Sequence, residues 1–155
     1  MNDKKYDSLK ENIKNINFDL LEDVMNREID LLVDAAEILD ARNTDTELQR
    51  IRKKAMSMDK ENKYNSEEGL DASLNYHTIN MRSRFRDIVN KDRNNNRVEW
   101  KREPYFYWVE RGIYRLLKND EKDIFRIAID KDLDIIYKDF YSLYQLKNEV
   151  KKIIG

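Results

Sequence analysis

Residues Leu74 to Leu117 read LNYHTINMRSRFRDIVNKDRNNNRVEWKREPYFYWVERGIYRLL. The stretch holds the chain's only histidine, its only proline and both tryptophans, together with its densest run of arginines. It begins with a helical pattern, continues through a polar turn and ends in an aromatic hairpin pattern. We therefore expect the special chemistry of the protein to lie here and the segments outside it to be helical scaffold.

The first part of the stretch has the spacing of an amphipathic helix. Met81, Phe85 and Ile88 recur at intervals of three to four residues, which places them on one face. We expect the helix to begin near residues 75–78, whose short side chains can accept from free backbone N–H groups. It should end at residues 94–96, because a run of asparagines favours turns.

The second part of the stretch predicts two or three short strands. β-branched and aromatic residues are concentrated at positions 97–100, 105–109 and 113–116. Pro104 suits an edge or a turn, and Gly112 supplies a backbone conformation that other residues resist. A helix followed at once by a small twisted hairpin is the second half of a winged helix-turn-helix.

Positive charge is segregated along the chain. From Tyr76 to Lys118, here called the basic stretch, there are eleven Arg or Lys against five Asp or Glu, although the whole chain has a net charge of −1. The first 75 residues carry twelve basic and eighteen acidic groups, and the last 37 carry seven and eight. A basic region of this kind suits the phosphate backbone of nucleic acid.

Two segments resemble a winged-helix family found beside or fused to bacterial restriction-type proteins. They are residues 76–82, YHTINMR, and residues 105–116, YFYWVERGIYRL. In that family a Thr-Ile dipeptide opens the recognition helix, and a Tyr-Phe pair followed by Arg-Gly-x-Tyr-Arg-Leu forms the wing strands. The resemblance implies binding of double-stranded DNA in transcription regulation, in restriction-modification or in another bacterial or mobile-element defence system.

The expected DNA contacts follow from the helix and the wing. The first turns of a recognition helix present side chains to base edges, and arginine can grip guanine or phosphate with two parallel donors. We predict helix contacts from Tyr76, His77, Thr78, Asn80, Arg82, Ser83, Arg84 and Arg86. We predict wing-tip contacts to the backbone or minor groove from Arg93, Arg97, Lys101 and Arg102. The alternative is that these arginines form salt bridges, with Asp87 and Glu99 as nearby partners.

The composition favours a mainly α protein with a small antiparallel β-hairpin, because 39% of the residues are charged and Gly and Pro together number only four. We expect a polar segment at residues 1–16, a winged-helix domain with a long N-terminal helix at 17–118, and an amphipathic C-terminal helix at 119–155. The absence of cysteine excludes disulfides and thiolate metal sites. With no apolar run long enough to span a membrane and no secretion signal, we expect a cytoplasmic protein.

Two further helices are predicted before the basic stretch. Apolar residues step by three and four from Asn17 to Arg42 and again from Glu47 to Met58. The second helix carries Arg50, Arg52, Lys53 and Lys54, which either touch phosphates from the flank or form a solvated face. Residues 59–73 lack periodicity and are expected to form a loop, ordered only if Leu70 and Leu74 dock.

The C-terminal segment predicts one long helix whose apolar face is broader than a small domain needs. A second copy of the chain could cover the surplus and place two recognition helices on one duplex. Alternatively, this helix packs against the helix at 17–42 of the same chain.

Other chemistries have weaker support in the sequence. The aromatic run at 105–108 could in part form a stacking surface for flipped or methylated bases. A Glu-x-Lys pair at 99–101 mimics a metal-dependent nuclease, but charged residues are so common here that chance explains it. We therefore predict no catalytic residues, no metal, no cofactor and no enzyme. The main alternative function is a protein-protein module, an adaptor or inhibitor that binds an acidic partner.

Overall fold

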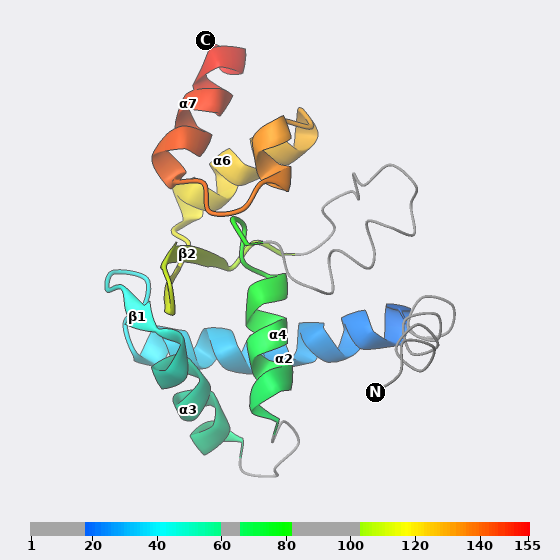
Figure 1. Cartoon of the computed structure of the whole chain (residues 1–155), viewed down its shortest axis with the longest axis vertical. Coiled ribbons are helices and arrows are strands. Elements are labelled where there is room, and N and C mark those ends of the chain that lie inside the picture. The colour runs from blue at the N-terminus through cyan, green and yellow to red at the C-terminus, as the bar shows by residue number, and fades with distance from the viewer. Residues whose placement is uncertain (1–17, 60–65, 82–102) are drawn as a thin grey trace, which may run out of the picture.

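The computed structural model describes residues 18–59, 66–81 and 103–155, with side chains from Arg27 onward. This part of the chain is mainly helical with a small antiparallel sheet (Figure 1). Its elements in chain order are α2 (Phe18–Ile38), β1 (Thr46–Glu47), α3 (Leu48–Met58), α4 (Glu67–Tyr76), β2 (Phe106–Glu110), β3 (Ile113–Leu116), α6 (Asn119–Asp130), the 3-10 helix η1 (Asp134–Tyr137) and α7 (Leu143–Ile154). The expected fold class is confirmed at this level.

The helices α2 and α3 follow the predicted spacing, and α2 ends for a local reason. The helix α2 stops where Asp40 adopts a left-handed conformation with φ of 57°. The Ala41 N–H then donates to the Ala36 carbonyl at 2.9 Å, which closes the last turn. No helix in the described part of the chain is long and apolar enough to cross a membrane.

The sheet contains three strands in the order β1-β3-β2, all antiparallel. The β2–β3 hairpin confirms the two strands predicted at 105–109 and 113–116, with Trp108 opposite Tyr114 and a bulge between Trp108 and Glu110. The two-residue strand β1 pairs Thr46 with Tyr114 and was not expected, because so short a strand leaves no pattern in the sequence. The predicted strand at 97–100 lies outside the described residues.

Glycine at position 112 can be tested directly. Gly112 has φ of 77° in the hairpin turn, and an added Cβ would meet no atom within 4 Å. Only the left-handed backbone therefore opposes a side chain, and Gly112→Ala should lower the free energy of unfolding by about 1 kcal/mol in chemical denaturation. Gly69→Ala, inside α4, is the matched control and should leave stability unchanged or raise it. An equal decrease in the free energy of unfolding in both variants would contradict the role of the left-handed backbone at Gly112.

The first hydrophobic core joins three helices to the sheet. The helices α2, α3 and α4 pack together, and α2 also contacts β3. Leu70 and Leu74 are fully buried in this core, as expected for an ordered segment. However, residues 67–73 form the helix α4 rather than a loop, and the Ser66 hydroxyl caps it by accepting from the Gly69 N–H. Their few apolar positions hid this helix from sequence analysis.

The second core lies in the C-terminal part and corrects the prediction of one long helix. The chain turns at Asp132, with φ of 49°, and again at Phe140, with φ of 59°, so α7 folds back against α6. Phe125 on α6 and Leu146 on α7 are fully buried between them. The apolar stripe that suggested either a second copy of the chain or packing on α2 is thus mostly covered within this helical unit.

Candidate nucleic-acid interface

The structure separates the twelve predicted DNA contacts into two groups. Eight of them, Arg82, Ser83, Arg84, Arg86, Arg93, Arg97, Lys101 and Arg102, lie outside the described residues. The other four, Tyr76, His77, Thr78 and Asn80, are 4%, 1%, 0% and 0% exposed. Their side chains therefore present almost no surface to a ligand in this structure, which argues against direct DNA contact at these four positions.

His77 and Thr78 end a helix instead of beginning one. The His77 Nδ1 donates to the Ser73 carbonyl at 2.8 Å, and the Thr78 hydroxyl donates to the Leu74 carbonyl at 2.7 Å. These side chains bind carbonyl groups at the end of α4, where the Leu74 carbonyl also accepts from the His77 N–H at 3.1 Å. The expected helix start at residues 75–78 is accordingly wrong. Tyr76 closes the same turn, with its ring edge-on to the His77 ring at 5.2 Å.

Asn80 holds three segments together. Its side-chain amide donates to the Trp108 carbonyl at 2.8 Å and to the Tyr141 carbonyl at 2.9 Å, while its Oδ1 accepts from the Trp108 N–H at 2.8 Å. The Asn80 carbonyl also accepts from the Phe140 N–H at 2.7 Å. Both amide hydrogens are thus used in a fully buried position, which explains why this side chain faces inward rather than toward a ligand.

Backbone contacts join the two segments that come before and after residues 82–102 in the sequence. Thr78 forms a parallel bridge with Phe106, and the His77 carbonyl accepts from the Tyr105 and Phe106 N–H groups at 3.2 and 3.0 Å. Met81, the last described residue before this stretch, is also in contact with the hairpin, because its sulfur lies 3.1 Å from the Tyr114 hydroxyl on β3. The two chain segments that flank residues 82–102 are therefore side by side.

Tyr114 on β3 is a buried tyrosine that also contacts the end of α4. The Tyr114 hydroxyl donates to Asn75 Oδ1 at 2.7 Å. Burial, and secondarily the charge of Asp71, raise the pKa of Tyr114 well above its usual range. Tyr114 is therefore a neutral hydrogen-bond donor in the fold at any pH at which proteins normally work.

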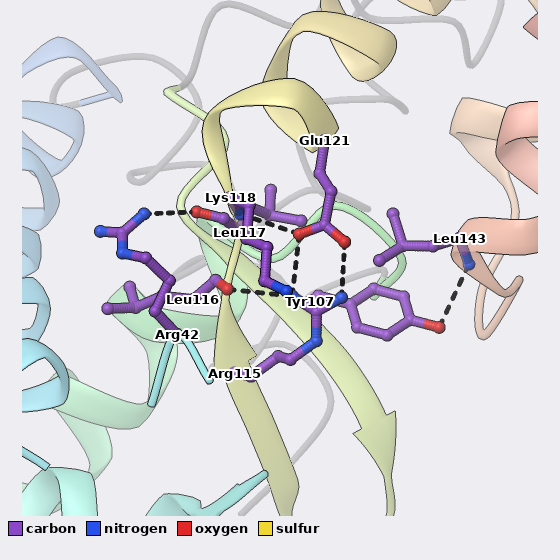
Figure 2. Close-up of polar contacts among 8 residues, drawn as sticks. All are labelled: Arg42, Tyr107, Arg115, Leu116, Leu117, Lys118, Glu121 and Leu143. Atoms are coloured by element: carbon purple, nitrogen blue, oxygen red, sulfur yellow. Dashed lines mark hydrogen bonds and ion pairs between the residues drawn. The ribbon is translucent and has the colours of Figure 1, made fainter. Parts of the chain in front are cut away.

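An ion pair connects the hairpin to the C-terminal unit (Figure 2). Arg115 on β3 donates through both terminal nitrogens to Glu121 on α6, at 2.8 and 2.6 Å, and the side chains are only 17% and 6% exposed. Burial opposes ionisation of Glu121, but the hydrogen bonds from Arg115 and from the Lys118 N–H outweigh it and lower its pKa. The hydrogen bond to Glu121 raises the pKa of Arg115.

Two further contacts flank this pair in Figure 2. Arg42, from the loop before β1, donates to the Leu117 carbonyl at 2.7 Å. The Tyr107 hydroxyl accepts from the Leu143 N–H at 3.2 Å, at the start of α7. The hairpin and the residue that follows it are therefore bound both to the loop before β1 and to the start of α7.

The charges on α3 and α4 differ in sign. Arg52 is used inside the fold, because it donates to Asp71 on α4 at 2.7 Å. Arg52 therefore has neither of the two roles considered for it, phosphate contact or part of a solvated face. Arg50 and Lys53 are exposed and form no ion pair with any described residue. The helix α4 has no basic residue, and its exposed Glu67 and Glu68 would repel a phosphate backbone.

The hairpin turn supplies a basic residue that sequence analysis missed. Arg111 lies between β2 and β3 and is exposed, whereas the predicted wing-tip residues fall before β2. Its position beside Gly112 in a strand-turn-strand pattern was the available signal. Among the described side chains, no group of three His, Cys, Asp or Glu residues could hold a metal ion.

Comparison of the chain with protein-family models, with curated proteins and with solved structures gave no match. The resemblance to winged-helix proteins therefore stays a prediction that rests on the residues quoted above.

Proposed function

We propose that the protein binds double-stranded DNA as a winged-helix protein. Its biological setting is proposed from the resemblance alone: transcription regulation or the specificity component of a restriction-type defence system. The observation that carries the proposal is the placement of the positive charge. Eight of the eleven basic residues of the basic stretch fall within residues 82–102, between α4 and the hairpin.

The arrangement of the described elements supports this proposal. Three helices, α2, α3 and α4, precede a hairpin whose inner strand β3 also pairs with β1, the strand between the first two helices. This order of elements is expected of a winged-helix unit. The exposed basic residues Arg50 and Lys53 on α3 and Arg111 at the hairpin turn add positive charge on described elements.

The acidic surface of α4 changes which residues we propose as DNA contacts. Because the exposed Glu67 and Glu68 make α4 unsuitable for DNA, we propose the basic residues of 82–102 as the main contacts, and Arg50, Lys53 and Arg111 as additional phosphate contacts. The buried residues Tyr76, His77, Thr78 and Asn80 are not among the contacts that we propose.

Removal of two arginines tests the proposal. Arg82→Ala combined with Arg86→Ala should weaken duplex binding and reduce the slope of log affinity against log salt by roughly 2, because each lost phosphate contact removes about one unit. Fluorescence anisotropy with a labelled mixed-sequence duplex at several salt concentrations measures both quantities. Lys147→Ala combined with Lys151→Ala, on exposed positions of α7, changes the net charge equally and should leave the slope nearly unchanged.

An equal decrease in duplex affinity in both double variants would show that net charge alone accounts for the effect. This result would contradict a localised interface. Absence of salt-sensitive binding to any duplex would favour the second candidate, a protein-protein module. The observation in its favour is Tyr144, which is 74% exposed on α7, the helix predicted to contact a partner.

A further inference from the structure

A carboxyl group is buried where two helices pack together. Glu28 lies on α2, and α4 crosses α2 in contact with it (Figure 1). Only 7% of Glu28 is exposed, although glutamate is almost never buried unless it has a charged partner. A Cβ added at Gly69 of α4 would lie 3.4 Å from the Glu28 Oε2, so the carboxyl group reaches the backbone of α4. Glu28 is therefore part of the contact between the two helices.

The polar neighbour of this carboxyl group is a serine of α4. Ser73 is fully buried, and its Oγ makes no hydrogen bond of normal geometry within the described part of the chain. Burial raises the pKa of Glu28, and the nearby Ser73 hydroxyl lowers this pKa to a smaller extent. Among the described residues, none forms an ion pair with Glu28. A negative charge on Glu28 is therefore poorly stabilised in the fold.

The other titratable groups of these helices are exposed or bonded elsewhere. Four charged residues close to Glu28 in the sequence or in the first turn of α4 are exposed, namely Arg27, Asp30, Glu67 and Glu68. Asp71 of α4 accepts from Arg52 of α3 at 2.7 Å. His77, at the end of α4, donates through Nδ1 to the Ser73 carbonyl at 2.8 Å. Burial and the Ser73 hydroxyl are thus the two influences on the ionisation of Glu28.

We propose that Glu28 makes the contact between α2 and α4 sensitive to protons: the neutral carboxyl group packs between the helices, and its ionisation loosens α4. The reason is that a carboxylate at this position regains water only when α4 moves away from α2. Looser packing of α4 would also affect the hairpin, because the His77 carbonyl at the end of α4 accepts from the Tyr105 and Phe106 N–H groups. This device is independent of the proposed DNA-binding function.

Hydrogen exchange of backbone amides tests this device. Glu28→Gln keeps the size of the side chain but cannot ionise. At neutral pH its α4 amides should exchange roughly tenfold more slowly than in the wild type, while α6 and α7 amides exchange equally in both proteins. A group whose pKa is raised by folding contributes stability in acid and loses it as the pH rises. The melting temperature of Glu28→Gln should therefore exceed that of the wild type by about 3 °C at neutral pH and equal it in acid.

A second variant should produce the opposite change. Ser73→Ala removes the hydroxyl that favours the ionised form, so its α4 amides should exchange faster than in the wild type at neutral pH and equally fast in acid. Glu68→Gln, on the exposed side of the same helix, is the matched control and should not slow exchange in α4. Three results would each overturn the device: equal or faster α4 exchange in Glu28→Gln at neutral pH, a difference that persists unchanged in acid, or equal slowing in α6 and α7.

Discussion

Replacement of Asn80 by aspartate is expected to lower the free energy of unfolding by about 4 kcal/mol at pH 7, since each of two buried acceptors left without a donor costs about 1–3 kcal/mol. The carboxylate cannot donate to the Trp108 and Tyr141 carbonyls, which lie 2.8 and 2.9 Å from the amide nitrogen. Urea denaturation followed by circular dichroism measures the loss.

The pH dependence of this loss identifies its cause. Burial beside two carbonyls should raise the pKa of the new carboxyl above its unfolded value, so the penalty should be present at neutral pH and shrink as the pH falls through that raised pKa. Asn80→Ala should destabilise the fold without this pH dependence. Asn119→Asp, the same change at an exposed position in the first turn of α6, should alter stability by less than about 0.5 kcal/mol. A small loss in Asn80→Asp would show that Asn80 does not hold the three segments together.

Loss of Glu121 is expected to cost about 3 kcal/mol, because removal of one partner from a buried ion pair leaves the other charge uncompensated. Glu121→Ala removes the two carboxylate oxygens that accept from Arg115, leaving it the Leu116 carbonyl at 3.1 Å, and frees the Lys118 N–H. This cost lies at the lower end of the range for broken buried ion pairs, because the Arg115 side chain keeps some exposure to water. Thermal and chemical denaturation measure the change. Glu103→Ala removes one of two acidic partners of Arg126, in a pair whose side chains are both exposed, and should cost no more than about 1 kcal/mol.

The sign of the pH effect at Glu121 follows from its lowered pKa. A carboxyl whose pKa falls below its ordinary value of 4.5 in the folded state stabilises the protein above that value and loses this contribution at more acid pH. The difference in stability between wild type and Glu121→Gln should therefore be constant near neutrality and narrow in acid. A difference that widens in acid would contradict the assigned shift.

The fold could be predicted where a long pattern was present. The helices α2 and α3 and the β2–β3 hairpin follow from apolar spacing and aromatic content. The helix α4 was missed because its buried face, formed by Leu70, Ser73, Leu74 and Tyr76, has too few apolar residues to show a helical pattern. The break between α6 and α7 was missed because apolar residues continue in helical spacing through the turns at Asp132 and Phe140, where tertiary contacts override the local pattern.

The candidate site was harder to predict than the fold. Asn80 stands two residues before Arg82, and an amide beside an arginine suggests base recognition. Its true partners, Trp108 and Tyr141, are 28 and 61 residues away in the sequence, so no local pattern could reveal them. Thr78 was assigned to the wrong end of a helix for a similar reason. A hydroxyl can cap either end, and only the tertiary structure shows which carbonyl it reaches.

The most direct test of the proposed interface is lysine modification of the protein with and without a mixed-sequence duplex, read by mass spectrometry. We predict protection of Lys91 and Lys101, within residues 82–102, and of the exposed Lys53 on α3, while Lys147 and Lys151 on α7 react equally in both samples. Protection confined to α7, or no protection at any lysine under conditions in which the duplex is bound, would contradict the proposal that residues 82–102 meet the DNA.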